Sequence, residues 1–249
     1  MRVAPGLEML ELSATLMNGP GILCPAVLWD QENAILVDAG LPGMAAQFLE
    51  AMEHAGIPQQ KLASIIVTHH DLDHIGSLRE LQEMIPHRVE IWSHPEEVPY
   101  IQGEIPPVKT TPRMMAQMAE QMQGVPEEQQ RAMRAMTEKV KSLKLRVDRV
   151  LSDGEVLPSC GGIQIIHTPG HTPGHICLYH SPSKTLIAGD ALFVDGNHLG
   201  PAPSFINADI PLALSSLKKL VRCDVASVIA YHGGLFQKSP NTRIAEIIG

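Results

Sequence analysis

The chain has 249 residues and a formal net charge of −8, and its Lys and Arg residues form no basic block. This charge argues against a nucleic acid as the main partner, because neutralising phosphates requires clustered positive charge. The four cysteines form no C-x-x-C pair, which is typical of free thiols in a reducing compartment. No export signal opens the chain, and no apolar run reaches the length of about 18 residues that a membrane span needs. We therefore expect a cytoplasmic protein that does not associate with a membrane.

The first third of the chain predicts short strands and one helix. One strand, or two, is expected within Leu7–Leu16. Ala26–Trp29 and Ala34–Val37 are apolar runs joined by a polar tetrapeptide, which predicts a β-hairpin. Pro42–Ala55 carries apolar side chains at helical spacing and is followed by Gly56, which predicts a helix that ends there.

The stretch Thr68–Gly76 is the strongest local signal in the chain. Five of its nine residues are His or Asp, and it directly follows the apolar run Ile65–Val67. A β-branched run that ends in ligand-type side chains predicts a buried strand with a metal site at its tip. Residues 75–81 then predict a helix whose N-terminus faces this site. Val89–Trp92 predicts the next strand, and we assign the following His94 a structural role.

Residues 100–146 predict a helical hairpin inserted between two strands. Pro112 follows the capping residue Thr111, and Pro126 begins a second helix. Both helices have a Met-rich apolar face, made of Met115, Met118 and Met122 in the first and Met133, Met136, Val140 and Leu143 in the second. Two interpretations stay open. The hairpin packs on the domain or on a second subunit as a homodimer contact, or it is a mobile lid hinged near Tyr100.

Three later strand ends also carry candidate ligands. After one apolar run, Thr-Pro-Gly turns separate three histidines, of which His171 is the candidate ligand and His167 and His175 are assigned supporting or structural roles. Asp190 follows the run at 185–188, and His232 follows the run at 228–231. Strand ends are rigid while their loops vary, so they are the usual places for chemistry in α/β proteins. Four such ends that converge can enclose a dinuclear metal site. A loop at 195–201, a helix at 209–221 and a short terminal helix complete the expected elements.

These motifs resemble the metallo-β-lactamase superfamily over residues 22–234. The carrying residues, in the family's order and spacing, are His69-x-Asp71-x-Asp73-His74, then His171, Asp190 and His232. The resemblance implies an α/β (α+β) fold, a four-layer αββα sandwich, here as one domain over residues 1–249 with the helical insertion at about 100–146. It also implies two divalent metal ions. His69, Asp71 and His171 would bind one, Asp73, His74 and His232 the other, and Asp190 would bridge them.

Asp71 departs from the family pattern, which has a second His at this position. A register slip would make His70 the ligand instead, but strand alternation places His69 and residue 71 on one side and favours Asp71. With two divalent ions and the carboxylates of Asp71, Asp73 and Asp190, the site has a net charge of +1. Carboxylates suit iron or manganese better than imidazoles do, and superfamily members with a carboxylate here, the flavo-diiron proteins, hold iron. We expect zinc first, with iron or manganese as the alternative.

The favoured function is metal-dependent hydrolysis of an acyl bond in a small molecule. A hydroxide bridging the metal ions would attack the carbonyl carbon, because metal binding lowers the pKa of water towards neutrality. Asp73 would orient this hydroxide and pass a proton to the leaving group. By resemblance, a lactone is the first candidate substrate and a thioester, as in glyoxalase II, is the second. The chain contains no G-x-S-x-G motif, so serine hydrolysis is not supported.

Two other classes of function stay open. A non-haem iron or diiron oxidoreductase on the same fold is favoured by Asp71, and a metal-bound binding protein without activity is the third class. Lactonases of the superfamily have a Tyr shortly after the bridging Asp, whereas this chain has Phe193, which lacks the hydroxyl. Phe193, His198 and Tyr100 are the candidate substrate contacts, and His198 is either a proton donor or a solvated loop residue.

Overall fold

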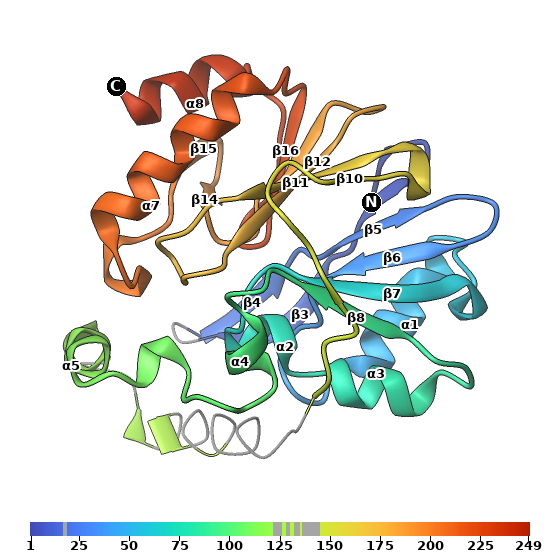
Figure 1. Cartoon of the computed structure of the whole chain (residues 1–249), viewed down its shortest axis with the longest axis horizontal. Coiled ribbons are helices and arrows are strands. Elements are labelled where there is room, and N and C mark those ends of the chain that lie inside the picture. The colour runs from blue at the N-terminus through green and yellow to red at the C-terminus, as the bar shows by residue number, and fades with distance from the viewer. Residues whose placement is uncertain (17–18, 122–125, 128–129, 132–134, 136–144) are drawn as a thin grey trace.

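Two β-sheets packed face to face, with helices on their outer faces, form the architecture of the protein (Figure 1). The computed structural model describes residues 1–16, 19–121, 126–127, 130–131, 135 and 145–249. In Figure 1, α1 and α3 cover the first sheet, and α7 and α8 lie beyond the second. The order helix, sheet, sheet, helix confirms the predicted αββα sandwich.

The first sheet is seven-stranded and mixed, with the order β1-β2-β5-β6-β7-β8-β9. Its strands are β1 (Arg2–Ala4), β2 (Leu7–Met9), β5 (Ala26–Trp29), β6 (Ala34–Val37), β7 (Leu62–Val67), β8 (Glu90–Ser93) and β9 (Arg149–Val150). The strands β6, β7, β8 and β9 run parallel to one another, whereas β5 and β6 are antiparallel. A separate hairpin pairs β3 (Leu12–Leu16) with β4 (Gly19–Leu23). All six residues of β7 except Ala63 are buried, as expected for a central strand covered on both faces.

The second sheet is six-stranded, with the order β10-β11-β12-β13-β16-β17. Its strands are β10 (Val156–Leu157), β11 (Ile163–His167), β12 (Ile176–His180), β13 (Thr185–Ile187), β16 (Ser227–Ala230) and β17 (Gly234–Phe236). Only β13 and β16 pair in parallel, so their carboxyl ends lie at the same edge. That edge is where Asp190 and His232 follow their strands.

The α-helices of the described residues are short. They are α1 (Ala45–His54), α2 (Leu72–Ile75), α3 (Leu78–Met84), α4 (Val98–Ile101), α5 (Pro112–Gln121), α7 (Ile210–Ser216) and α8 (Pro240–Ile248). Short 3₁₀ helices lie between them: η1 (Gln59–Lys61), η2 (Val108–Thr110), η3 (Ser159–Gly161), η4 (Ser204–Ile206) and η5 (Leu217–Arg222). The helix predicted to start at Ile75 is divided into α2 and α3, so His74 lies within a helical turn and not before one.

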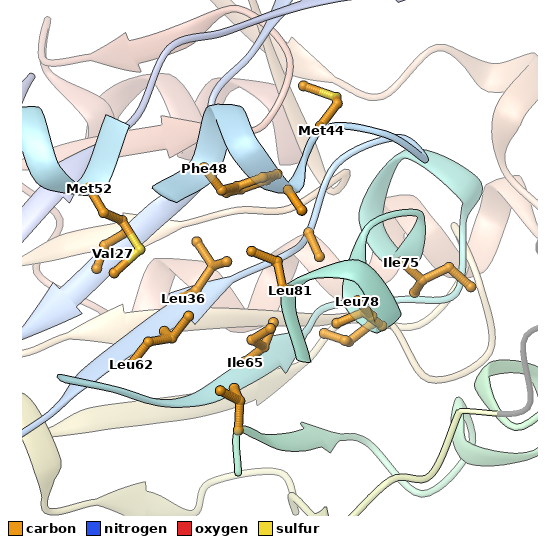
Figure 2. Close-up of a cluster of buried hydrophobic side chains, with 14 of the residues drawn as sticks. Val27, Leu36, Met44, Phe48, Met52, Leu62, Ile65, Ile75, Leu78 and Leu81 are labelled. Atoms are coloured by element: carbon orange, nitrogen blue, oxygen red, sulfur yellow. The ribbon is translucent and has the colours of Figure 1, made fainter. Parts of the chain in front are cut away.

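Three apolar clusters separate the four layers. The first lies between the first sheet and α1 and α3, where Phe48, Met52 and Leu81 pack on Leu36 and Ile65 (Figure 2). The second lies between the sheets, and the third lies between the second sheet and the C-terminal helices. Each face of each sheet is therefore covered by apolar side chains, which makes the strand ends rigid supports for the loops that follow them.

The segment at 195–201 differs from its prediction, and the predicted insertion is described only in part. The expected loop at 195–201 is a β-hairpin of β14 (Leu192–Asp195) and β15 (His198–Pro201), which turns at Gly196 with φ of 57°. Its buried Val194 and Leu199 lie opposite each other, so the segment has the alternation of a strand pair. In the insertion, α5 confirms the first helix. Most of the predicted second helix lies outside the described residues, and so do Met122, Met133, Met136, Val140 and Leu143 of the predicted apolar faces. Within α5, Met114 is buried and Met115 is 58% exposed.

None of the described helices has the length and apolar character needed to cross a bilayer.

Candidate metal centre

Loops from four strand ends bring the predicted ligands together. The loop after β7 supplies His69 and Asp71, and α2, which follows it, supplies Asp73 and His74. The loop between β11 and β12 supplies His171, and the ends of β13 and β16 supply Asp190 and His232. Their ligand-type atoms form two groups, each with spacing that a metal ion can span: His69, Asp71, His171 and Asp190 in the first, and Asp73, His74 and His232 in the second. These are the two sets expected from the sequence, and their binding of metal remains a prediction.

The first group is tightly packed around Asp71. Oδ2 of Asp71 lies 3.1 Å from Nε2 of His69 and 3.0 Å from Nε2 of His171. His171 Nε2 also lies 3.5 Å from Oδ2 of Asp190. Asp71 therefore lies beside His69 and His171, the two residues with which the resemblance to the family groups it.

The second group is centred on Oδ1 of Asp190. This oxygen lies 3.4 Å from Nε2 of His74 and 3.5 Å from Nε2 of His232. Oδ2 of Asp73 lies 3.2 Å from the same nitrogen of His232. Because Oδ2 of Asp190 faces the first group and Oδ1 faces the second, this carboxylate lies between them, as a bridging residue must.

The donor set of the second group fits a cation. Among the described residues, Nε2 of His74 and Oδ1 of Asp190 are buried atoms without a hydrogen-bond partner, although they lie 3.4 Å apart. Unpaired buried polar atoms are costly and call for an explanation such as a missing ion. The other nitrogen of His74, Nδ1, faces Oδ2 of Asp38 at 2.9 Å. With a proton on Nδ1, His74 presents a lone pair from Nε2 towards the Asp190 carboxylate, which is an arrangement that a metal ion satisfies.

The pKa values of the histidines in the second group also favour a bound cation. Burial lowers the pKa of His74, but the carboxylates of Asp38, Asp190 and Asp73 outweigh it and raise this pKa well above its usual range. Burial is likewise outweighed at His232, where Asp190 and Asp73 raise the pKa to about 10. A site that holds protons this strongly has an excess of negative charge, and a divalent cation is the natural alternative occupant.

Residues behind the ligands hold them in place. Asp38, whose φ is 66°, accepts hydrogen bonds from the Thr68 amide at 2.8 Å and from its hydroxyl. His175 Nε2 accepts a hydrogen bond from the Asp190 amide at 3.0 Å, and Asn207 Oδ1 lies 3.1 Å from His171 Nδ1. The sequence indicated a supporting or structural role for His175. Asn207 was missed, because it lies in a loop without a motif.

His70 lies outside both groups. Its Nδ1 contacts Oε2 of the fully buried Glu97, and its amide donates to the same oxygen at 2.8 Å. Its ring stacks on Tyr100, with centroids 4.1 Å apart. Glu97 also accepts from the Thr172 hydroxyl and the Gly174 amide, both at 2.7 Å. His70 therefore joins the loop after β7 to the loop that carries His171, and Tyr100 belongs to this support.

The other two candidate substrate contacts lie on the β14–β15 hairpin. Phe193 stacks against His232, with ring centroids 4.8 Å apart, and so borders the second group. His198 is exposed, and its Nε2 faces the Arg243 guanidinium at 2.6 Å. The structure brings Phe193 to the site but gives His198 a contact with the terminal helix α8 instead. Substrate binding by either residue remains a prediction.

A third set of ligand-type side chains, His94, Glu96 and His167, lies nearby. The rings of His94 and His167 are stacked with centroids 3.9 Å apart and planes within 13°. The nitrogen lone pairs of two parallel rings point along parallel planes and do not meet at one ion. This agrees with the structural role expected for His94.

Lys109 is a site residue that nothing in the sequence led us to expect. It lies in η2, within the insertion, and its side chain is 17% exposed. Its ammonium contacts Oδ2 of Asp71 and lies 3.1 Å from Nε2 of His171. No motif surrounds this lysine, so only the three-dimensional structure connects it to the first group.

The sequence was compared with protein-family profiles and with curated proteins. Residues 25–232 match the sequence profile of the family described as the Metallo-beta-lactamase superfamily. Among curated proteins, the chain is 28% identical over 238 residues to hydroxyacylglutathione hydrolase GloC of Haemophilus influenzae, covering 91% of this chain and 90% of that protein. It is 44% identical over 71 residues to an N-acyl homoserine lactonase of a Bacillus species, covering 27% of each chain.

A solved structure shows the same fold. The crystal structure of a metallo-beta-lactamase family protein from Thermus thermophilus aligns with a TM-score of 0.68 and 24% identity. The alignment covers 99% of this chain and 79% of that one.

Proposed function

Since the chain belongs to the metallo-β-lactamase superfamily, we propose that it is a metal-dependent hydrolase that cleaves an acyl bond, either a lactone or a thioester, in a small molecule. Membership of a superfamily of metallo-hydrolases supports an enzyme that binds metal. The residues of the second group, together with Asp190, would hold the ion.

One observation carries this proposal. His74 and Asp190 direct a nitrogen and an oxygen without hydrogen-bond partners at each other in the buried part of the site that the structure describes. Folding gains nothing from leaving such atoms unpaired, and it usually costs about 1–3 kcal/mol for each. A bound cation removes this cost, and in hydrolases it acts as a Lewis acid that activates water near neutral pH.

The protein's own groups supply proton transfer. Asp73 is the most exposed carboxylate of the site, with 24% of its side chain exposed, so it can reach both water and a leaving group. Burial raises its pKa, but His74 and His232 outweigh this and hold the pKa below its usual value. Asp73 is therefore ionised at neutral pH and fits the role of proton acceptor. Phe193, on the other side of His232, offers an apolar surface and no hydroxyl to a carbonyl group.

The choice between the two substrate classes rests on the relatives. The hydroxyacylglutathione hydrolase match extends over nearly the whole of both chains and favours a thioester. The lactonase match is shorter but higher in identity and favours a lactone, as does the repeated Thr-Pro-Gly-His segment. Both reactions need the same carbonyl activation, so one site can serve either.

The test combines metal analysis with two substrate panels. Protein is purified from cultures without supplement and with added zinc, iron or manganese, its metal content is measured, and hydrolysis of lactones and thioesters is followed. We expect bound metal, with zinc giving hydrolysis, and we expect Asp190→Asn to lose both. The matched control is Asp195→Asn, which removes an exposed carboxylate from the nearby hairpin.

Each outcome has a clear meaning. Hydrolysis that disappears in Asp190→Asn but not in Asp195→Asn supports the proposal. Bound metal without hydrolysis on either panel contradicts it and leaves a binding protein. Iron as the main metal, with oxygen consumption in the presence of a thiol or persulfide, would move the oxidoreductase alternative to first place.

A further inference from the structure

The first and second groups of the metal centre differ in how their polar atoms are satisfied. In the second group, His74 Nε2 and Asp190 Oδ1 have no hydrogen-bond partner among the described residues. In the first group, Asp71 Oδ2 contacts His69, His171 and the Lys109 ammonium. One group is therefore open to a cation, while the other already contains one.

The lysine is held in this position by its backbone. The neighbouring amide of Val108 donates to Nε2 of His70 at 3.2 Å, and the hydroxyl of Thr110 donates to the Pro107 carbonyl at 2.7 Å. His70 in turn is fixed by Glu97. The turn that carries Lys109 is thus bound to His70, which lies between His69 and Asp71 in the sequence. The backbone therefore holds Lys109 where its ammonium reaches the first group.

Charge balance distinguishes one ion from two. The carboxylates of Asp71, Asp73 and Asp190 contribute −3. One divalent ion and the Lys109 ammonium contribute +3, so the site is neutral. Two divalent ions and the ammonium contribute +5 and leave a net charge of +2, with the ammonium beside an ion of the same sign. Like charges at such short range in a buried site oppose each other strongly.

We propose that Lys109 occupies the first cation position, so that the chain binds one divalent ion, held by Asp73, His74, His232 and Asp190. This replaces the two ions expected from the sequence. It also explains the residue at position 71, because a carboxylate pairs with an ammonium whereas the His of the family motif would not. Asp71 and Lys109 together take the place of a His and a metal ion. The inference rests on the proposed metal centre and is independent of the substrate.

The test counts metal ions in the folded protein. Wild type, Lys109→Met, and the double variant Asp71→His/Lys109→Met are incubated with excess Zn²⁺ and desalted. Bound zinc is measured by elemental analysis and by native mass spectrometry. We expect about one ion per chain in the wild type and about two in both variants. The matched control is Lys184→Met, which removes an exposed lysine paired with Asp224 at the surface and is expected to keep one ion.

The double variant guards against misfolding. If Lys109→Met leaves Asp71 unpaired and fails to fold, Asp71→His/Lys109→Met restores the family's ligand type at position 71 and still tests the count. Two ions in the wild type overturn the inference, and so does a count of one in every folded variant that lacks Lys109. No ion in the wild type contradicts the proposed metal centre itself, which is a different failure from a count of two.

Discussion

The side chain of Asp38 lies 2.9 Å from Nδ1 of His74 and, through its other oxygen, accepts the amide hydrogen of Thr68. Asp38 directly follows β6, whereas His74 belongs to α2, and both are buried. This contact fixes which nitrogen of His74 faces the proposed metal centre. Because Asp38 has a positive φ, the residue at this position must tolerate the left-handed conformation as well as supply a carboxylate.

Asp38→Asn should weaken metal binding while leaving the fold intact. Asn tolerates positive φ and has the same size, but it loses the charge and presents an amide to the hydrogen-bond donors of Thr68. Changes behind a metal ligand typically cost about 10–100-fold in affinity, and we expect a loss in this range. Competition with a chromophoric chelator measures it. Asp195→Asn is the control, and equal affinities in the two variants would refute the role of Asp38.

Glu97→Gln should destabilise the protein by about 2–4 kcal/mol, because it replaces a buried carboxylate that accepts four hydrogens. An amide can accept from only one side, so donors on His70 or on the 172–174 loop lose their partner. Urea unfolding followed by circular dichroism gives the free energy. Glu96→Gln, at the exposed neighbouring position, should stay within about 0.5 kcal/mol of wild type. Similar losses in both variants would contradict the argument.

His94 should make the protein less stable in acid. Burial, together with the neighbouring His167, lowers the pKa of His94 from 6.5 to about 4. Between these values the unfolded chain binds more protons at this position than the folded one, so stability is lost as pH falls from 6.5 towards 4. We expect His94→Gln to remove about 1–2 kcal/mol of the loss measured between pH 7 and pH 4.5. His54→Gln, an exposed histidine, should change nothing; an unchanged pH profile for His94→Gln would count against the prediction.

Gly233→Ala tests the turn that follows His232. Gly233 has φ of 100°, and an added Cβ would overlap the carbonyl oxygen of Val194. Both strain and overlap oppose the substitution, so we expect a loss above about 3 kcal/mol or failure to fold. Gly196→Ala has positive φ but open space around its Cβ and should cost only about 1–2 kcal/mol. Thermal melts of both variants separate overlap from strain, and equal melting temperatures would show that overlap is absent.

The strands and the ligand loops were predictable because their signals are local. Ala26–Trp29 and Ala34–Val37 form the predicted strands residue for residue, since each is a short apolar run bounded by turn residues. The position of the candidate ligands at strand ends was expected from the residue pattern, and their division into two groups from the resemblance to the family. The hairpin β14–β15 was missed, because its strands have only four residues each and the glycine and proline around them suggested a loop.

The interactions that complete the site were not predictable, because they join distant positions without a motif. Lys109 contacts Asp71 across 38 positions of sequence, and Glu97 contacts Gly174 across 77. Lys109 lies in a 3₁₀ turn and Glu97 precedes a short helix, and no sequence pattern around either residue indicates that it belongs to the site. Strand alternation favoured Asp71 over His70 as a ligand, and this choice stays a prediction. The contact of His70 with Glu97, which holds His70 outside both groups, could be seen only in the fold.

The position of the centre, between two sheets, has a consequence for how the protein unfolds. Asp73 and His74 follow a strand of the first sheet, whereas Asp190 and His232 follow strands of the second. The proposed ion, held by all four residues, would cross-link the two sheets, which would then separate only after the ion leaves. The lifetime of the folded state then depends on the rate of metal release, so a chelator should accelerate unfolding even under conditions in which the native state remains the favoured one.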